Sequence, residues 1–211
     1  MLLYWVCPAL CFFVCLPLLY RLKKRSKALS ITFKTLGTCC ALVLALYGVF
    51  TGRGSNWLCA AALAFGTAAD AMLEIRFFPG MMLFALGHVC SCIWFVCLCP
   101  PSGVHAWAVL ALLAVAAGLL FAWRRLLGKL MLPFAGYAAM LCLMAGLAVG
   151  TGWTLGNIGG LLLALGGLLF LVSDIMVARG LIKRMSLRFD CIAMIVYDSA
   201  QLLLAAACTL I

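Results

Sequence analysis

Residues 157–177, NIGGLLLALGGLLFLVSDIMV, form an apolar run whose only charged side chain is Asp174. At about 1.5 Å per residue, a helix of this length crosses the roughly 30 Å hydrocarbon core of a bilayer. A carboxylate inside such a helix costs several kcal/mol and is by default a candidate functional group. The segment therefore predicts a transmembrane helix that carries a functional carboxyl.

Similar apolar runs occupy most of the remaining chain, and turn residues such as Gly and Pro separate many of them. The 211 residues are 68% hydrophobic and 9% charged, which leaves too few polar side chains to cover a soluble domain. We predict an all-α polytopic membrane protein with eight transmembrane helices, forming a single integral membrane domain over residues 1–211. The other seven helices are expected near residues 3–20, 29–50, 56–73, 80–98, 106–122, 131–149 and 190–210.

Basic residues explain the net charge of +10 and predict the topology. They lie in short clusters between apolar runs, a pattern typical of cytoplasmic loops, so no nucleic-acid partner is predicted. All Lys and Arg residues except Lys34 and Arg53 fall in or beside the loops after helices one, three, five and seven. Both termini are therefore expected on the non-cytoplasmic side. The first apolar run precedes its basic cluster, unlike a cleavable signal, and should remain as a helix. We expect an integral protein of a bacterial cytoplasmic membrane.

Asp70 is the second carboxyl inside an apolar run, and its sequence context resembles that of Asp174. Phe65-Gly66-Thr67-Ala68-Ala69-Asp70 and Phe170-Leu171-Val172-Ser173-Asp174 lie in predicted helices three and seven. This weak repeat suggests a duplication of two four-helix halves. Each aspartate is expected about three residues from the cytoplasmic end of its helix. The alternative role is interfacial, with Arg76 paired to Asp70 and with Arg179 or Lys183 paired to Asp174.

Five further polar residues in apolar runs are candidates for substrate binding. Lys34 either extends to the membrane surface or contacts a lipid phosphate. His88 is either a packing residue or a functional one, and Gln201 is expected to face the interior because an amide is costly in lipid. Tyr197 lies one turn before Gln201 on predicted helix eight, so the two share a face of that helix. Tyr137 lies one turn after Pro133 on predicted helix six.

Metal chemistry has little support in this sequence. His105 is the only histidine besides His88, and it is expected at the opposite end of the membrane, so a three-histidine zinc site cannot form. Neither a metal nor another cofactor is predicted.

In order and spacing, these residues resemble the YhhN family, which includes mammalian lysoplasmalogenases. The resemblance spans most of the chain, although Thr35, Cys92 and Asp198 depart from the family pattern. It rests on Lys34, Gly66 with Asp70, the stretch Gly80-Met81-Met82-Leu83-Phe84-Ala85-Leu86-Gly87-His88, Pro133 with Tyr137 and Met144, Gly166, Phe170 through Asp174, Tyr197, and Ala200-Gln201.

The resemblance implies a membrane hydrolase that cleaves the vinyl ether bond of a lysophospholipid. Either Asp70 or Asp174 would donate the proton, and the other carboxylate would stabilise the resulting oxocarbenium ion, as in glycosidases. The implied partners are the lysophospholipid and membrane lipids, and no oligomeric state is predicted. One alternative is a small-molecule or proton-coupled transporter in which the two aspartates are ion sites. Another is a lipid-binding or structural membrane protein.

Overall fold

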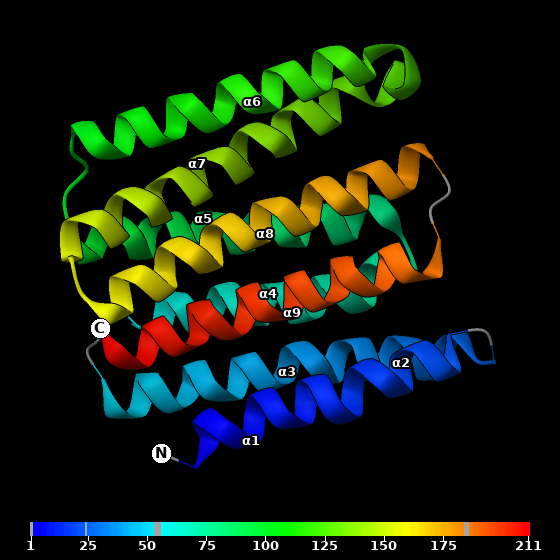
Figure 1. Ribbon diagram of the computed structural model, residues 1–211, viewed down its shortest axis with the longest axis horizontal. Coiled ribbons are helices and arrows are strands. Elements are labelled where there is room, and N and C mark those ends of the chain that lie inside the picture. Colours follow the sequence, from blue (N-terminus) through cyan, green and yellow to red (C-terminus); the bar gives the residue numbers. More distant parts are fainter. Residues whose placement is uncertain (1, 24, 53–55, 184–185) are drawn as a thin grey trace.

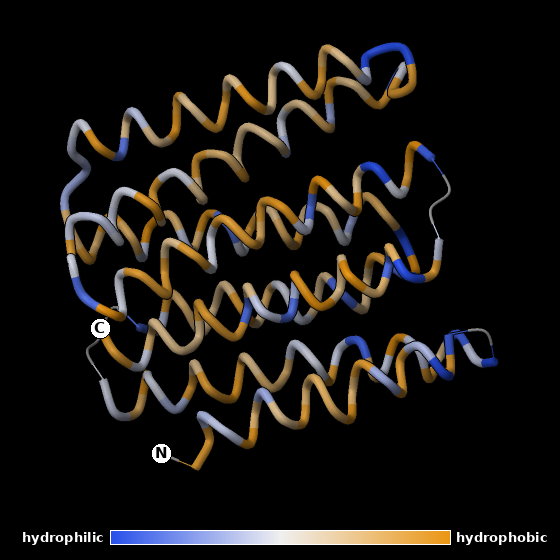
Figure 2. Tube along the Cα trace, viewed as in Figure 1, coloured by the Kyte–Doolittle hydropathy of each residue, from blue (hydrophilic) through white to orange (hydrophobic). Residues whose placement is uncertain are grey.

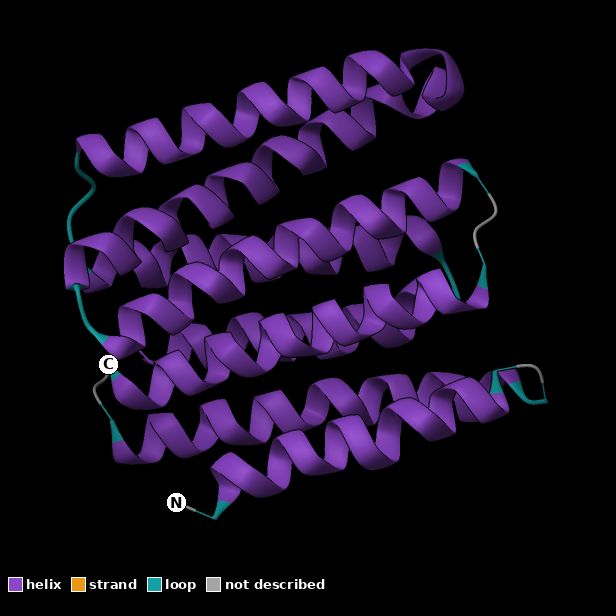
Figure 3. Cartoon of the chain, in the orientation of Figure 1, coloured by secondary structure: helices purple, strands orange, loops and turns teal. Residues whose placement is uncertain are grey.

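The computed structural model describes residues 2–23, 25–52, 56–183 and 186–211, which are helical apart from short connections (Figures 1 and 3). Lys24, Arg53 and Arg184, three of the basic residues used to predict topology, lie outside these residues. The helices are α1 (Leu3–Leu10), the π-helix η1 (Cys11–Cys15), α2 (Leu16–Leu22), α3 (Lys27–Thr51), α4 (Asn56–Leu73), α5 (Phe77–Leu98), α6 (Gly103–Leu127), the 3₁₀ turn η2 (Gly128–Leu130), α7 (Met131–Leu155), α8 (Ile158–Ile182) and α9 (Leu187–Leu210).

Seven segments of the described chain are long and apolar enough to cross a membrane. The longest, Gly103–Leu155, contains both α6 and α7. The chain reverses at Gly128, whose φ of 51° is a conformation that favours glycine, and α6 and α7 then run antiparallel (Figure 1). The all-α fold is thus confirmed for the described residues, and the long apolar helices are compatible with a polytopic membrane protein, while the eight crossings and the side on which the termini lie stay predictions.

Several helices extend beyond the predicted apolar runs. Both α6 and α8 continue through arginines to Leu127 and Ile182, because the long aliphatic stems of basic side chains let a helix extend into the membrane interface. Asp174 therefore lies eight residues before the end of α8, or about 12 Å at the rise of an α-helix. The predicted depth of three residues was wrong for Asp174, but it holds for Asp70 in α4.

Six helices form a closed ring in which each packs against the next, in the order α3, α4, α5, α7, α8 and α9. The first span, built from α1, η1 and α2, packs outside α3, and α6 packs outside α7, so that these two form opposite edges of the molecule (Figure 1). The last four spans thus repeat the neighbour relations of the first four. This is the arrangement that a duplication would produce, although the duplication stays a prediction.

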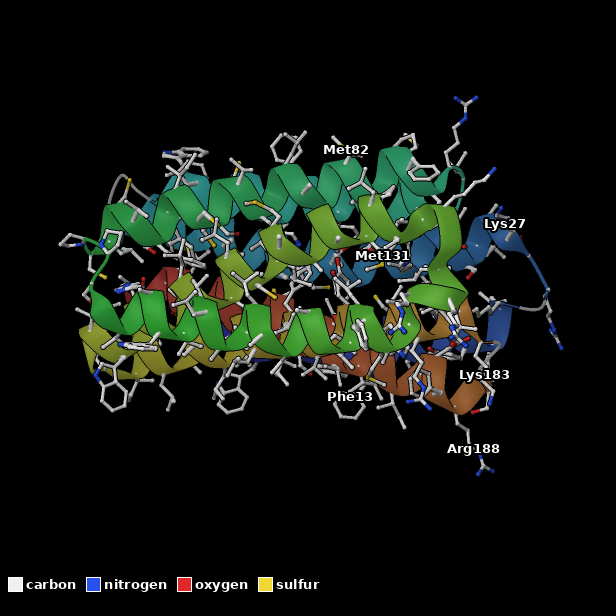
Figure 4. All side chains as sticks on the ribbon, turned by 90° about the horizontal axis from the view of Figure 1, so that it is seen from above. Phe13, Lys27, Met82, Met131, Lys183 and Arg188 are labelled. Atoms are coloured by element: carbon white, nitrogen blue, oxygen red, sulfur yellow. The ribbon has the colours of Figure 1, made fainter. Side chains whose placement is uncertain are left out.

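Basic side chains gather at one end of the bundle, which we call the basic end. Hydrophilic stretches concentrate there in Figure 2, and the labelled Lys27, Lys183 and Arg188 mark the same end in Figure 4. The connections after α2, α4, α6 and α8 all lie there, as the charge pattern predicted (Figure 1). The described residues of this group are Arg21, Lys23, Arg25, Lys27, Arg76, Arg124, Arg125, Lys129, Arg179, Lys183 and Arg188.

Candidate functional site

A cavity of about 170 Å³, which we call the outer cavity, brings together five of the seven predicted site residues. Apolar residues from α4 to α9 make up the rest of its lining, so the polar groups are confined to one part of an otherwise hydrophobic chamber. This combination is typical of a small-molecule site, where a few polar groups orient an apolar ligand. The five are Lys34, Asp70, Tyr137, Asp174 and Tyr197.

Asp70 is held in a charged cluster between α3, α4 and α9. Its side chain is 1% exposed, and its Oδ1 lies 3.4 Å from Lys34 Nζ. Tyr197 donates a hydrogen bond of 2.9 Å to the other carboxylate oxygen. Lys34 also lies 3.6 Å from Glu74, one turn beyond Asp70, so its ammonium joins the two acidic side chains. A buried carboxylate with a cation and a hydroxyl donor is one whose charge the protein compensates.

Asp174 has different surroundings, although it lines the same cavity. Tyr137 donates a hydrogen bond of 2.5 Å to its Oδ2. His88 Nε2 lies 3.3 Å from the same tyrosine oxygen, which extends the chain of polar groups to α5. Among the described residues, no ion pair involves Asp174. The two aspartates therefore share a cavity but differ in charge compensation.

A second, smaller cavity of about 20 Å³, which we call the inner cavity, shares Phe84 with the lining of the outer cavity. His88 and Gln201 line this cavity and not the outer one. Each contacts a tyrosine that is bonded to one of the aspartates. Gln201 Nε2 donates a 2.8 Å hydrogen bond to Tyr197, and His88 contacts Tyr137. The lining comprises Cys59, Ala62, Leu63, Gly66, Phe84, Gly87, His88, Ser91, Trp94, Met144, Phe170, Gln201 and Leu204.

Aromatic rings separate the two cavities. The ring of Phe170 lies 5.4 Å from that of Tyr197 and 5.0 Å from that of His88, both edge-on, and Phe84 packs edge-on against Phe170 and Tyr197 at 6.0 Å. Such edge-to-face contacts fix ring orientation. Gly66 lies close beside them, since a Cβ at this position would lie 3.0 Å from Gln201 Nε2.

Residues of both α6 and α7 line the outer cavity. The two helices are in close contact near one end, where a Cβ on Gly150 would lie 2.8 Å from His105 Cα. Nearer the basic end, no described atom lies within 4 Å of a Cβ added at Gly118 or Gly136. The residues of α6 that line the cavity lie between Leu112 and Trp123.

The interfacial alternatives for the acidic residues are not observed. Lys34, and not Arg76, is the partner of Asp70 and Glu74, because the ring places α3 directly beside α4. Neither Arg179 nor Lys183 pairs with Asp174 in the described part of the chain. Sequence reasoning missed this ion pair, since hydropathy and spacing do not show which helices are neighbours.

Two other polar residues lie away from both cavities. His105 is at the end opposite the basic one, as predicted, where its ring contacts Ser102 and Thr151 and completes the cap of α6. Asp198 is buried beside Gly37, and a Cβ at Gly37 would lie 3.6 Å from Asp198 Oδ2. As expected from its position on α9, about 100° from Tyr197, it lines neither cavity.

Fold and site together are those of an all-α protein with membrane-length apolar helices, in which a mostly apolar chamber is lined by the two carboxyls of Asp70 and Asp174. The chain belongs to the YhhN family, whose profile matches residues 29–208 and so confirms the family resemblance. Comparisons with curated proteins and with solved structures gave no significant match.

Proposed function

We propose that this protein hydrolyses the vinyl ether bond of lysoplasmalogens, releasing a fatty aldehyde and a glycerophospho-headgroup, in the cytoplasmic membrane of a bacterium. The observation that carries the proposal is that Asp70 and Asp174 line one cavity whose remaining lining is apolar. A lipid with a single hydrocarbon chain suits a hydrophobic chamber that lies next to the membrane. Membership of the YhhN family supports the same reaction class.

The surroundings of the two carboxyls suggest how they divide the work. Asp70 lies beside the Lys34 ammonium and is the ionised group. Asp174 has no cation paired with it among the described residues, so we assign it the protonated form, with Tyr137 holding its side chain in place. Asp174 is accordingly the general acid in this proposal, and Asp70 is the carboxylate that stabilises positive charge. Such a division follows when two carboxyls have unlike environments.

The reaction begins with proton transfer from Asp174 to the outer carbon of the vinyl ether. This leaves an oxocarbenium ion on the carbon bonded to oxygen, which the negative charge of Asp70 stabilises. Water then adds to that carbon and returns a proton to Asp174. The resulting hemiacetal loses its hydroxyl proton, the bond to the glycerol oxygen breaks, and that oxygen gains a proton. An aldehyde and a free alcohol result, with no net change in the enzyme.

The remaining predicted site residues support these groups. Tyr137 and Tyr197 orient the two carboxyls and border the reacting bond. Lys34 keeps Asp70 charged and provides the cation nearest to a lipid phosphate in the cavity. His88 and Gln201 act through the tyrosines. The hydrocarbon chain would lie against the apolar residues of α6, α7 and α8.

The proposal is tested by replacing each carboxyl with its isosteric amide. Asp70→Asn and Asp174→Asn should each reduce aldehyde release from a lysoplasmalogen, by purified protein in detergent, at least a hundredfold. Asp190→Asn is the matched control, because the Asp190 side chain is 40% exposed and its one ion pair among the described residues is with Lys23 at the surface. Full activity in both interior variants, with all proteins folded, would exclude the mechanism.

A transporter is the second candidate, and the repeated arrangement of the two halves favours it. Lys34 of α3 pairs with Asp70 of α4, and Tyr137 of α7 likewise bonds Asp174 of α8. Paired sites between duplicated halves are common in transporters. Aldehyde production separates the two candidates, since a transporter would release none from purified protein.

A further inference from the structure

The inner cavity contains buried polar groups that the reaction described above does not use. The Trp94 side chain is 1% exposed, and its Nε1–H has no hydrogen-bond partner in the described part of the chain. Ser91, one turn earlier on the same face of α5, is also buried and lines the same cavity. A buried N–H without a partner is destabilising, and ordered water commonly satisfies such groups.

The size and lining of the inner cavity match those of a water site. Its volume of about 20 Å³ exceeds the roughly 10–15 Å³ that one water molecule needs. A water molecule also needs two to four polar partners, and Ser91, Trp94, His88 and Gln201 all line the space. The apolar side chains of Leu63, Met144 and the other lining residues enclose the rest of the cavity.

Each aspartate is connected to the inner cavity through one tyrosine. His88 lines the cavity and contacts the Tyr137 oxygen, and Tyr137 donates to Asp174. Gln201 lines the same cavity and donates to Tyr197, which donates to Asp70. When His88 carries its proton on Nε2, its Nδ1 is an acceptor that needs a donor on the cavity side. A water molecule held by Trp94 and Ser91 would supply that donor.

We infer that the inner cavity is a hydration site, in which one water molecule held by Trp94 and Ser91 positions His88 and, through Tyr137, the acid Asp174. This inference rests on the proposed function for its kinetic consequence, but not for the presence of water. Trp94, Ser91 and His88 are positioning residues, because they line a cavity separate from the one that would hold the substrate.

The presence of water is tested without reference to activity. The protein in detergent is irradiated with X-rays in ¹⁸O-labelled water, so that radicals formed from bound water oxidise adjacent side chains, and the products are located by mass spectrometry. We expect label on Trp94 and Met144, which line the cavity although they are buried, and none on Phe95, which is equally buried but does not line it. Ser91→Leu, which fills the space, should abolish the label. Absence of label in the unaltered protein would overturn the inference.

The positioning role is tested with Trp94→Phe, which removes the donor and keeps the aromatic ring. We expect kcat for aldehyde release to fall roughly fivefold with KM unchanged, because one hydrogen bond to the water molecule is lost. Trp107→Phe is the control, because Trp107 is 75% exposed on α6 and should behave as the unaltered protein. An unchanged kcat in Trp94→Phe would refute the positioning role. If the unaltered protein releases no aldehyde, the proposed function fails, and the labelling experiment alone decides whether the cavity is hydrated.

Discussion

The ion pair between Lys34 and Asp70 makes a quantitative prediction about the interior of this protein. Lys34→Met removes the ammonium and keeps a side chain of similar length, and Asp70→Asn removes the negative charge with little change of shape. A cycle of the two single variants and the double variant measures the coupling between these two residues. The contact of Lys34 with Glu74 is absent from both variants that carry the Lys34→Met substitution, so its contribution cancels in the cycle.

The expected magnitude follows from distance and burial. Across 3.4 Å, at an effective dielectric constant of about 20, the Coulomb attraction is about 5 kcal/mol. Desolvation of the two groups offsets part of this, which leaves an expected coupling energy of about 2 kcal/mol or more. The surface pair of Lys23 and Asp190 lies at 3.3 Å with side chains 42% and 40% exposed. In water its attraction is about 1.3 kcal/mol before salt screening and loss of side-chain entropy, so its coupling should be below about 1 kcal/mol.

The free energy of unfolding is measured by adding sodium dodecyl sulfate to protein in mild detergent micelles and following tryptophan fluorescence. Identical cycles are run on the interior pair and on Lys23→Met with Asp190→Asn. The two pairs have the same chemistry and nearly the same separation, so burial is the variable that differs most. Coupling energies that agree within about 0.5 kcal/mol would refute the conclusion that the bundle interior strengthens the Lys34–Asp70 pair.

Three further substitutions test the helix packing and the acid. Gly150→Ala should lower the free energy of unfolding by about 1–3 kcal/mol, because the new Cβ would lie 2.8 Å from His105 Cα. Gly118→Ala, where nothing lies within 4 Å, should instead be neutral or stabilising by up to about 1 kcal/mol, and equal losses at both sites would contradict the close contact. Tyr137→Phe removes the donor to Asp174 and should lower kcat for aldehyde release roughly tenfold at constant KM. An unchanged rate would show that this hydrogen bond does not assist the acid.

The helical segments of this fold could be predicted because the signal is local. An apolar run of about 20 residues must satisfy its backbone hydrogen bonds internally when lipid surrounds it, and a helix does so. The break between α6 and α7 could also be predicted from a local signal, because Arg124, Arg125 and Lys129 interrupt the apolar pattern there. Helix ends were less predictable. Residues beyond Val177 in α8 are partly polar, yet they remain helical because long side chains carry their charge away from the helix.

The candidate site was predictable in its members but not in its pairing. Asp70, Asp174 and Lys34 stand out because charged groups are rare in apolar runs, and this rarity is visible in sequence. That Lys34 contacts Asp70, and that His88 contacts Tyr137, depends on which helices are neighbours in the ring. Trp94 gave no signal at all, since a tryptophan in an apolar run is ordinary until its N–H is seen to be buried without a hydrogen-bond partner among the described residues.

The sequence by itself determined the helical membrane architecture, the gathering of basic residues at one end and the small set of costly polar groups, because hydrophobic length and charge act within one segment. Only the tertiary structure decided how those groups divide between two cavities. Packing of helices distant in the chain sets this division, with Asp70 compensated by a cation from α3 and Asp174 joined through Tyr137 to α5. Two aspartates with similar sequence contexts thereby acquire different electrostatic surroundings.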